Sequence, residues 1–246
     1  MERNKVYNEC CFELFKKIPD RSIDLIVTDP PYNMTKNEWD KEIDWQEWWK
    51  EINRIKKDNA AVIMFSAQPF TTDLIMSNRK SFRYSLVWDK VLPVGFLNAN
   101  KMPLRSHEDI CVFYDNLPFY NPVKSTGHNR KIVKNRKCNQ NNNYGDFKDG
   151  ASYDSTERFP TSLMTFSNGG TRTEILHPTQ KPIELIKYIL RMYADKHFII
   201  ADFFAGSGTT FEACKSLGLD YIGCELDKDY FRIINKRLSQ VQGSLF

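Results

Sequence analysis

The sequence contains no Cys-x-x-Cys pair and no apolar run long enough to cross a membrane. Its six cysteines stand at positions 10, 11, 111, 138, 214 and 224. This spacing suits neither a zinc site nor a disulfide framework, so we expect reduced thiols and no bound metal. A membrane span needs about 18 consecutive apolar residues. Because no stretch approaches that length, we expect no association with a membrane.

The sequence also lacks a secretion signal, since the charged and polar residues 1–5 lead into no apolar segment. We therefore expect a soluble, cytoplasmic protein. The 246 residues are 41% hydrophobic, which is enough to bury one sizeable core. Chains of this length with an α/β pattern are commonly one domain, so we predict a single domain spanning residues 1–246.

Short apolar runs alternate with amphipathic segments along most of the chain. The apolar runs predict buried strands at 23–28, 60–65, 84–88, 110–114, 198–201 and 221–224. Apolar residues spaced three and four apart predict helices at 45–55, 183–193, 210–217 and 230–238. Asp44 is placed to cap the first helix, whose tryptophans we expect to pack in the core. This alternation predicts an α/β fold with a mostly parallel sheet and helices on both faces.

The segment 116–173 differs from the rest because it is rich in Asn, Lys, Gly, Ser and Thr and has no helical or strand period. A long stretch of this kind is usually functional or disordered, so we interpret it as an inserted region with its own task. Its cations predict contacts with nucleic-acid phosphates, although a solvated surface loop would also explain them. The candidate DNA-binding residues are Lys124, Arg130, Lys131, Arg136 and Lys137.

A glycine-containing turn joins the predicted strand at 198–201 to the helix at 210–217. Gly206 and Gly208 let the backbone approach a ligand closely, and the helix that follows begins with free N–H groups. Glu225 ends the next predicted strand, where a carboxylate can accept hydrogen bonds from ribose hydroxyls. Phe211 stands where a dinucleotide site has a third glycine, which favours a mononucleoside ligand. A purely structural turn is the alternative.

A second motif, Asp29-Pro30-Pro31-Tyr32, directly follows the predicted strand 23–28. The two prolines stiffen the loop, so the Asp29 carboxylate and the Pro30 carbonyl can point at one place. The exocyclic amino group of a nucleobase has two N–H donors, which these acceptors would satisfy. Tyr32 offers a ring for stacking on an extruded base. An ordinary strand-ending turn is the alternative.

The order of the motifs resembles that of the amino-type DNA methyltransferases of the beta class. In that family the Asp-Pro-Pro-Tyr loop comes first, the target-recognition region second and the Phe-x-Gly-x-Gly loop last, as Phe204 to Gly208 do here. The stretches 177–182 and 6–29 are also similar to the family's. Outside 116–173, the resemblance extends from Val6 to about Leu238.

The resemblance implies a Rossmann-like S-adenosylmethionine-dependent methyltransferase fold with permuted motif order, in which 116–173 recognises the target. It implies S-adenosylmethionine as the cofactor and a catalytic role for Asp29, Pro30, Pro31 and Tyr32. The chain departs from the family at Asn8-Glu9, where the family usually has Gly-Asp. The implied cofactor-binding residues are Glu9, Cys10, Asp29, Lys181, Asp202, Phe203, Phe204, Ala205, Gly206, Gly208, Thr209, Thr210, Glu225 and Leu226. His107 and Glu108 also look family-like, and we expect them to serve the structure.

The implied reaction is direct methyl transfer to the N6 of adenine in a specific sequence of double-stranded DNA, after the base has left the stack. In the family, an aspartate at the position of Asp29 favours adenine over cytosine. The alternatives are transfer to the N4 of cytosine, RNA methylation, an inactive DNA-binding module and a nicotinamide dehydrogenase. The last would leave the Asp-Pro-Pro-Tyr motif unexplained. A homodimer, a partner restriction enzyme and a bacterial or phage-infected host remain open.

Overall fold

The computed structural model describes residues 1–32, 43–136, 151–168 and 180–241. The chain divides into two compact units. Unit 1 consists of Met1–Asn121 and Ser162–Phe246, and unit 2 of Pro122–Thr161. Unit 2 therefore occupies only the middle of the insertion predicted at 116–173, and both ends of that segment belong to unit 1.

Unit 1 is built on an eight-stranded sheet in the order β1-β10-β9-β2-β3-β5-β4-β8. Among its described strands, β5 alone runs against its neighbours, which confirms the predicted mostly parallel sheet. The strands are β1 (Lys5–Tyr7), β2 (Ile23–Thr28), β3 (Lys56–Ser66), β4 (Phe82–Val94), β5 (Arg105–Phe113), β8 (Leu163–Thr165), β9 (Ile199–Asp202) and β10 (Asp220–Cys224).

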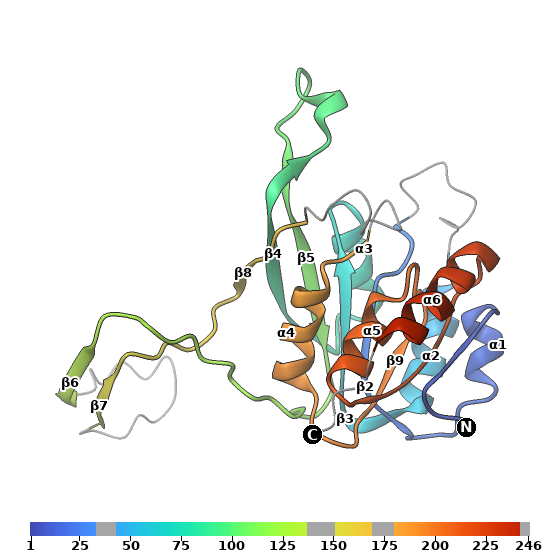
Figure 1. The fold of residues 1–246 in the computed structure, drawn as a ribbon, viewed down its shortest axis with the longest axis horizontal. Coiled ribbons are helices and arrows are strands. Elements are labelled where there is room, and N and C mark those ends of the chain that lie inside the picture. Colours follow the sequence, from blue (N-terminus) through green and yellow to red (C-terminus); the bar gives the residue numbers. More distant parts are fainter. Residues whose placement is uncertain (33–42, 137–150, 169–179, 242–246) are drawn as a thin grey trace. The chain divides into compact units, whose positions relative to one another are not determined.

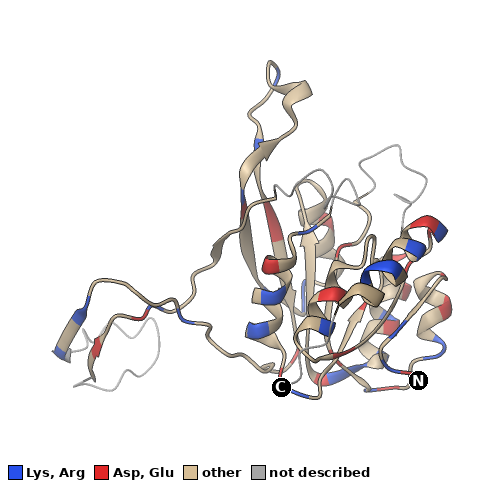
Figure 2. Cartoon of the chain, viewed as in Figure 1, with Lys and Arg blue, Asp and Glu red and all other residues tan. Residues whose placement is uncertain are grey.

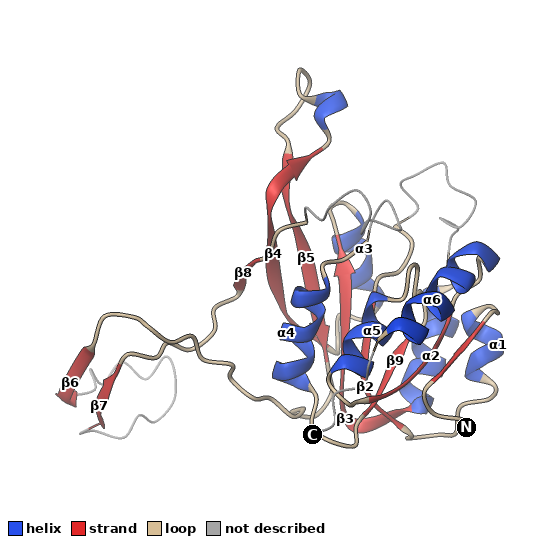
Figure 3. Ribbon diagram, viewed as in Figure 1, coloured by secondary structure: helices blue, strands red, loops and turns tan. Residues whose placement is uncertain are grey.

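Helices cover both faces of the sheet, as predicted (Figures 1 and 3). Three of them share a core with one face: α1 (Cys11–Phe15), α2 (Trp45–Ile55) and α3 (Phe70–Ser77). The other three lie together on the opposite face: α4 (Ile183–Tyr193), α5 (Thr209–Ser216) and α6 (Lys228–Gln240).

Helix α2 shows how local sequence and packing agree. It begins at Trp45 because the Asp44 side chain accepts hydrogen bonds from the N–H groups of Gln46 and Glu47, which would otherwise lack partners. Its apolar stripe then buries Trp48 completely, and the neighbouring Trp49 contacts Phe113 of β5 with ring centroids 5.0 Å apart. The tryptophans therefore belong to the core, as expected.

Strands β4 and β5 are longer than their apolar runs predicted. They form a hairpin that continues past the end of β3, whose last residue Ser66 pairs with Asp109. The short 3-10 helix η1 (Phe96–Asn98) lies at the tip of this hairpin (Figure 1). The apolar pattern missed the extension because its strands pair with each other and not with a buried core.

Unit 2 contains an antiparallel hairpin of β6 (Lys131–Arg136) and β7 (Ala151–Ser155). An isolated bridge between Ser125 and Arg158 lies outside the two strands. The sequence predicted no regular structure here. The ribbon is exposed, so it needs no alternation of apolar and polar residues that a sequence pattern could detect.

Candidate functional site

The two sequence motifs are brought together at one edge of the sheet. Strands β2 and β9 are parallel neighbours, and both end at this edge. The Thr28 hydroxyl, one residue before Asp29, donates to the Asp202 carboxylate at 2.7 Å. It also accepts from the Phe203 N–H at 3.3 Å. The Asp-Pro-Pro-Tyr loop and the glycine turn are therefore joined by hydrogen bonds between the residues that precede them.

Asp29 lies at the centre of the first part of the site. Its Oδ1 accepts a hydrogen bond from the Tyr32 hydroxyl at 2.8 Å, and its Oδ2 accepts from the Lys181 ammonium. Pro30 is buried, and the Tyr32 ring stacks on Phe70 of α3 with centroids 5.0 Å apart. One face of the partly buried Tyr32 ring therefore packs against Phe70, and its stacking on a base stays a prediction.

Lys181 connects Asp29 to the β4–β5 hairpin. Its buried ammonium lies 3.4 Å from Glu108 Oε2, and Glu108 Oε1 also accepts from Lys90 at 2.5 Å. The sequence placed Lys181 with the cofactor and gave Glu108 a structural role. Their sequence context did not show that the two residues and Asp29 form one largely buried cluster with alternating charges.

The charges of this cluster shift one another's ionisation. Burial raises the pKa of Asp29, and Lys181 only partly opposes that rise. For Glu108, burial raises the pKa, but Lys181 and Lys90 outweigh it and the net pKa falls below its usual value. For Lys181, burial lowers the pKa, but Asp29 and Glu108 outweigh it and the net pKa rises. Lys181 therefore stays protonated between two carboxylates.

The glycine turn forms the second part of the site. Gly206 and Gly208 both have positive φ, 51° and 80°. A Cβ on Gly208 would lie 2.8 Å from the Ile234 side chain of α6, so only glycine fits there. Arg237 of α6 supports the turn by donating a hydrogen bond to the Ser207 carbonyl at 2.6 Å. Sequence patterns gave no signal for Arg237, which stands 30 residues further along the chain.

Several residues of this turn face inward. The Phe203 ring packs on Phe15 in the core, with centroids 4.8 Å apart. Burial raises the pKa of Asp202 to about 6, while the hydrogen bonds its carboxylate accepts from hydroxyl and backbone groups partly oppose that rise. Ala205, Thr209 and Thr210 are also buried. What this segment can offer a ligand is therefore mainly the backbone around Gly206 and Gly208, together with the partly buried Phe204.

Glu225 directly follows β10 and lies beside the turn. Its Oε2 accepts from the Gly206 N–H at 2.7 Å, and its Oε1 from the Asp227 N–H at 2.8 Å. Burial raises the pKa of Glu225 to about 7, and these two N–H groups only partly oppose the rise. The next residue, Leu226, is exposed.

Glu9 and Cys10 lie close to this end of the sheet. The Asn8 amide donates to the carbonyls of Glu225 and Leu226, at 2.9 and 3.1 Å, and so ties the residue before Glu9 to the loop after β10. Glu9 Oε2 accepts from Lys17, whereas the buried Oε1 has no hydrogen-bond partner among the described residues. Cys10 is exposed.

The candidate DNA-binding cations fall into three groups. Lys124 pairs with Glu157 at 2.9 Å, and Arg130 donates to Asp154 at 2.7 Å. Lys131 is exposed and makes no ion pair within the described part of the chain. Arg136 ends β6, and Lys137 lies outside the described residues. The acids of the returning segment therefore neutralise part of the basic block.

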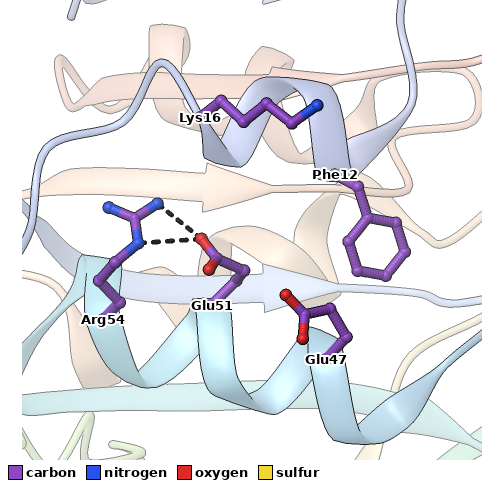
Figure 4. A pocket seen from close by; sticks show the side chains of 5 residues that line it. All are labelled: Phe12, Lys16, Glu47, Glu51 and Arg54. Carbon is purple, nitrogen blue, oxygen red and sulfur yellow. Dashed lines mark hydrogen bonds and ion pairs between the residues drawn. The ribbon is translucent and has the colours of Figure 1, made fainter.

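A pocket of about 480 Å³ between α1 and α2 is separate from both motifs. Figure 4 shows Glu51 in this pocket with both of its dashed contacts made to Arg54. Arg54 also donates to the carbonyl of Phe15, the last residue of α1, at 2.7 Å and to that of Ile18, three residues further on, at 3.0 Å. These contacts stabilise the packing of the two helices, and none of the lining residues belongs to the site.

Two general findings concern the described residues only. None of their helices is long and apolar enough to cross a membrane. They contain no group of three or more His, Cys, Asp or Glu side chains arranged to hold a metal ion. The described cysteines are free, and all of them except Cys10 are buried.

Comparison with known proteins identifies relatives of this chain. Type II methyltransferase M1.MboII of Moraxella bovis is 27% identical, over 98% of this chain and 99% of its own. DNA adenine methyltransferase YhdJ of Escherichia coli is 29% identical, over 95% of this chain and 81% of its own.

Two solved structures share the fold. M1.HpyAVI in complex with SAM has a TM-score of 0.66 and 23% identity, covering 95% of this chain and 98% of its own. PvuII DNA methyltransferase, described as cytosine-N4-specific, has a TM-score of 0.67 and 16% identity, covering 98% and 89%. The model of the DNA methylase family of N6 and N4 methyltransferases matches residues 23–236. This chain therefore belongs to the DNA methylase family.

Proposed function

We propose that this protein methylates the N6 amino group of adenine in double-stranded DNA, with S-adenosylmethionine as the methyl donor. The observation that carries the proposal is the bonding of Thr28 to both Asp202 and Phe203. It joins a loop with the acceptors for an amino group to a turn that can hold a nucleoside. A methyl donor and a target nitrogen held on these two segments would lie side by side.

The residues of the second segment fit the donor. S-adenosylmethionine supplies a methyl carbon bound to a sulfonium, which leaves as a neutral thioether. Gly206 and Gly208 keep the backbone free of side chains, and Glu225 retains acceptor capacity for ribose hydroxyls because each carboxylate oxygen has two lone pairs. The partnerless Oε1 of Glu9 is an acceptor suited to the adenine amino group of the donor.

The first segment fits the target base. Asp29 accepts one hydrogen bond at each oxygen, from Tyr32 and Lys181, so an acceptor position remains at each for an N–H of the base. The Pro30 carbonyl would take the second N–H. As the nitrogen gains a methyl group it becomes positive, and the negative charge of Asp29 stabilises it until the nitrogen releases one proton to water and becomes the neutral methylated amine. Orientation and electrostatic stabilisation thus account for catalysis without a covalent enzyme intermediate.

The test is methylation of unmethylated genomic DNA, with the products digested to nucleosides and identified by mass spectrometry. We expect N6-methyladenine from the wild-type protein. We expect Asp29→Ala to lose methylation by a factor of at least about 100, the scale of a lost electrostatic contact in a transition state. Its affinity for S-adenosylmethionine should stay close to that of the wild type.

The outcomes separate the remaining possibilities. N4-methylcytosine would keep the fold and the role of Asp29 but overturn the choice of base. Methylation of RNA in place of DNA would overturn the substrate, and no methylation with or without bound cofactor would favour an inactive module. Wild-type turnover by Asp29→Ala would contradict the role of Asp29.

We further propose that unit 2 contacts DNA and that the protein acts in the bacterial cytoplasm. The support for DNA contact is its exposed cations, of which Lys131 is free of ion pairs among the described residues. The support for the location is that the curated relatives are bacterial enzymes. Dimerisation remains a prediction that sedimentation of the purified protein would test.

A further inference from the structure

The tip of the β4–β5 hairpin exposes large apolar side chains to solvent. Phe96 is 80% exposed, its neighbour Leu97 is 99% exposed, and Met102 on the returning side is 56% exposed. Figure 1 shows the tip standing clear of the other elements of unit 1. Adjacent, fully exposed apolar residues on a projecting element are typical of a contact surface.

The charge on the hairpin indicates the chemistry of its partner. Residues 91–107 include no Asp or Glu, whereas Lys101 and Arg105 are present and exposed. Figure 2 shows the projecting part of the hairpin with blue segments and no red. Asparagines at positions 98 and 100 add side chains that can both donate and accept. A partner for such a tip needs negative charge beside an apolar contact area. A nucleic acid supplies both, through its phosphates and its stacked bases, whereas a protein surface with few acids does not.

The position of the hairpin is fixed by its root. Glu108 of β5 accepts from Lys90 of β4 and pairs with Lys181, which in turn donates to Asp29. The root is therefore part of the cluster that holds the proposed target base. The tip extends from that root beyond the carboxyl edge of the sheet, on the side where a base must enter.

The backbone at the root departs from a regular hairpin. The pairing shifts register between Asp89 and Val94, and Val91 has a φ of 65°, a conformation that β-branched residues rarely adopt. The Val91 N–H is held by the Asp89 side chain at 3.2 Å. Strain of this kind persists only where the surroundings over-determine it and is concentrated at functional sites.

We propose that residues 95–104 enter duplex DNA beside the target base, with Phe96 and Leu97 as an apolar wedge that fills the stack left by the flipped base. Lys101 and Arg105 contact the flanking phosphates. A two-stranded β-ribbon fits the major groove, and apolar wedges unstack base steps in known complexes. This inference rests on the proposed function, because the wedge is needed only where a base leaves the duplex.

The test compares two substrates that differ in the cost of extruding the base. Once methylated genomic DNA has given the target sequence, kcat/KM is measured on a paired duplex and on a duplex with an abasic site opposite the target base. For Phe96→Ala/Leu97→Ala we expect a loss of about tenfold on the paired duplex, as for removal of a stacking contact. Most of that loss should disappear on the abasic duplex, and the affinity for S-adenosylmethionine should not change.

Leu117→Ala is the matched control. Leu117 is 80% exposed, but it follows the end of β5 and so lies at the opposite edge of the sheet from the hairpin tip. We expect wild-type activity on both substrates. Lys101→Ala should weaken binding to all DNA sequences and reduce the salt dependence by about one counterion.

Three results would overturn the wedge. The first is an undiminished kcat/KM in the double variant, and the second is an equal loss on both duplexes. The third is a wild-type protein that sediments as an oligomer while the double variant sediments as a monomer, which would make the hairpin an interface between copies of this chain. If the wild-type protein methylates no DNA, the proposed function fails instead, so the two failures can be told apart.

Discussion

At the scale of residues, the site depends on buried charges that balance one another. Asp29 and Glu108 face Lys181, and Lys90 supplies a second cation to Glu108. Buried ions are costly unless they are paired, and removing one partner leaves another uncompensated. The cluster therefore stabilises the fold only as a complete set, which makes the position of Asp29 depend on two other segments of the chain.

Glu225 gives the first prediction at this scale, and its sign follows from burial. The pKa of its carboxyl is raised from 4.5 to about 7 in the folded protein. Between pH 4.5 and about 7 the Glu225 carboxyl is therefore protonated in the folded state but ionised in the unfolded state. This contribution to the free energy of unfolding is complete below about pH 4.5 and is lost as the pH rises through about 7. Urea denaturation of wild type and Glu225→Gln from pH 4.5 to 8 checks it, because the variant should show a smaller decrease, with Asp202 and its pKa of about 6 still contributing the rest.

Cofactor binding should show the opposite trend with pH. The ionised Glu225 is the better acceptor for ribose hydroxyls, so the affinity for S-adenosylhomocysteine should be about tenfold lower at pH 6 than at its plateau above pH 8. Calorimetry measures this affinity, and Glu225→Gln should bind weakly with a flat profile. A Gln variant with the wild-type profile would assign the pH dependence to another group.

At the scale of elements, helix α2 carries the tryptophans of the core and depends on one cap. Asp44→Ala removes the acceptor for two N–H groups and should lower the free energy of unfolding by about 1 kcal/mol. Chemical denaturation measures the change, and methylation should be unaffected at 25 °C. The matched control is Arg232→Ala, which breaks an exposed pair on α6 with Asp229 and should cost less than about 0.5 kcal/mol. Equal effects of the two substitutions would contradict the role of the cap.

The elements also show which patterns in the sequence were informative. Strands β2, β9 and β10 were predicted within about two residues of their ends, because each is a short apolar run buried on both faces. The β4–β5 extension and the ribbon of unit 2 were missed, because exposed hairpins need no buried face. The short helix α1 was missed as well, since five residues are too few to show a period.

At the scale of the whole molecule, the division into two units separates the chemistry from part of the proposed DNA contact. Both motifs lie in unit 1, whereas the basic segment is unit 2. Within unit 2, Arg130 is engaged by Asp154, whereas Lys131 is free of ion pairs among the described residues. A cation that is already paired has less to gain from a phosphate.

This difference predicts unequal effects on DNA binding. The affinity of the wild-type protein should fall as salt is raised from 50 to 200 mM (about tenfold or more), since bound phosphates release counterions. Lys131→Ala should reduce the salt slope by about one counterion, and Arg130→Ala should reduce it less. Fluorescence anisotropy at several salt concentrations measures the slopes, with Lys50→Ala on α2 as a control on unit 1. An affinity independent of salt would exclude phosphate contact by unit 2.

The fold class, the order of the motifs and the family of the chain could all be predicted from the sequence. These properties reside in apolar periodicity and in contiguous residues such as Asp29-Pro30-Pro31-Tyr32, which are visible without knowing what lies next to them. The fold was needed to show that Glu108 and Lys181 join Asp29, that Arg237 supports the glycine turn and that the hairpin lies beside the site. The reason is physical, because these contacts join residues far apart in the chain and depend on strand order and burial, which no local pattern encodes.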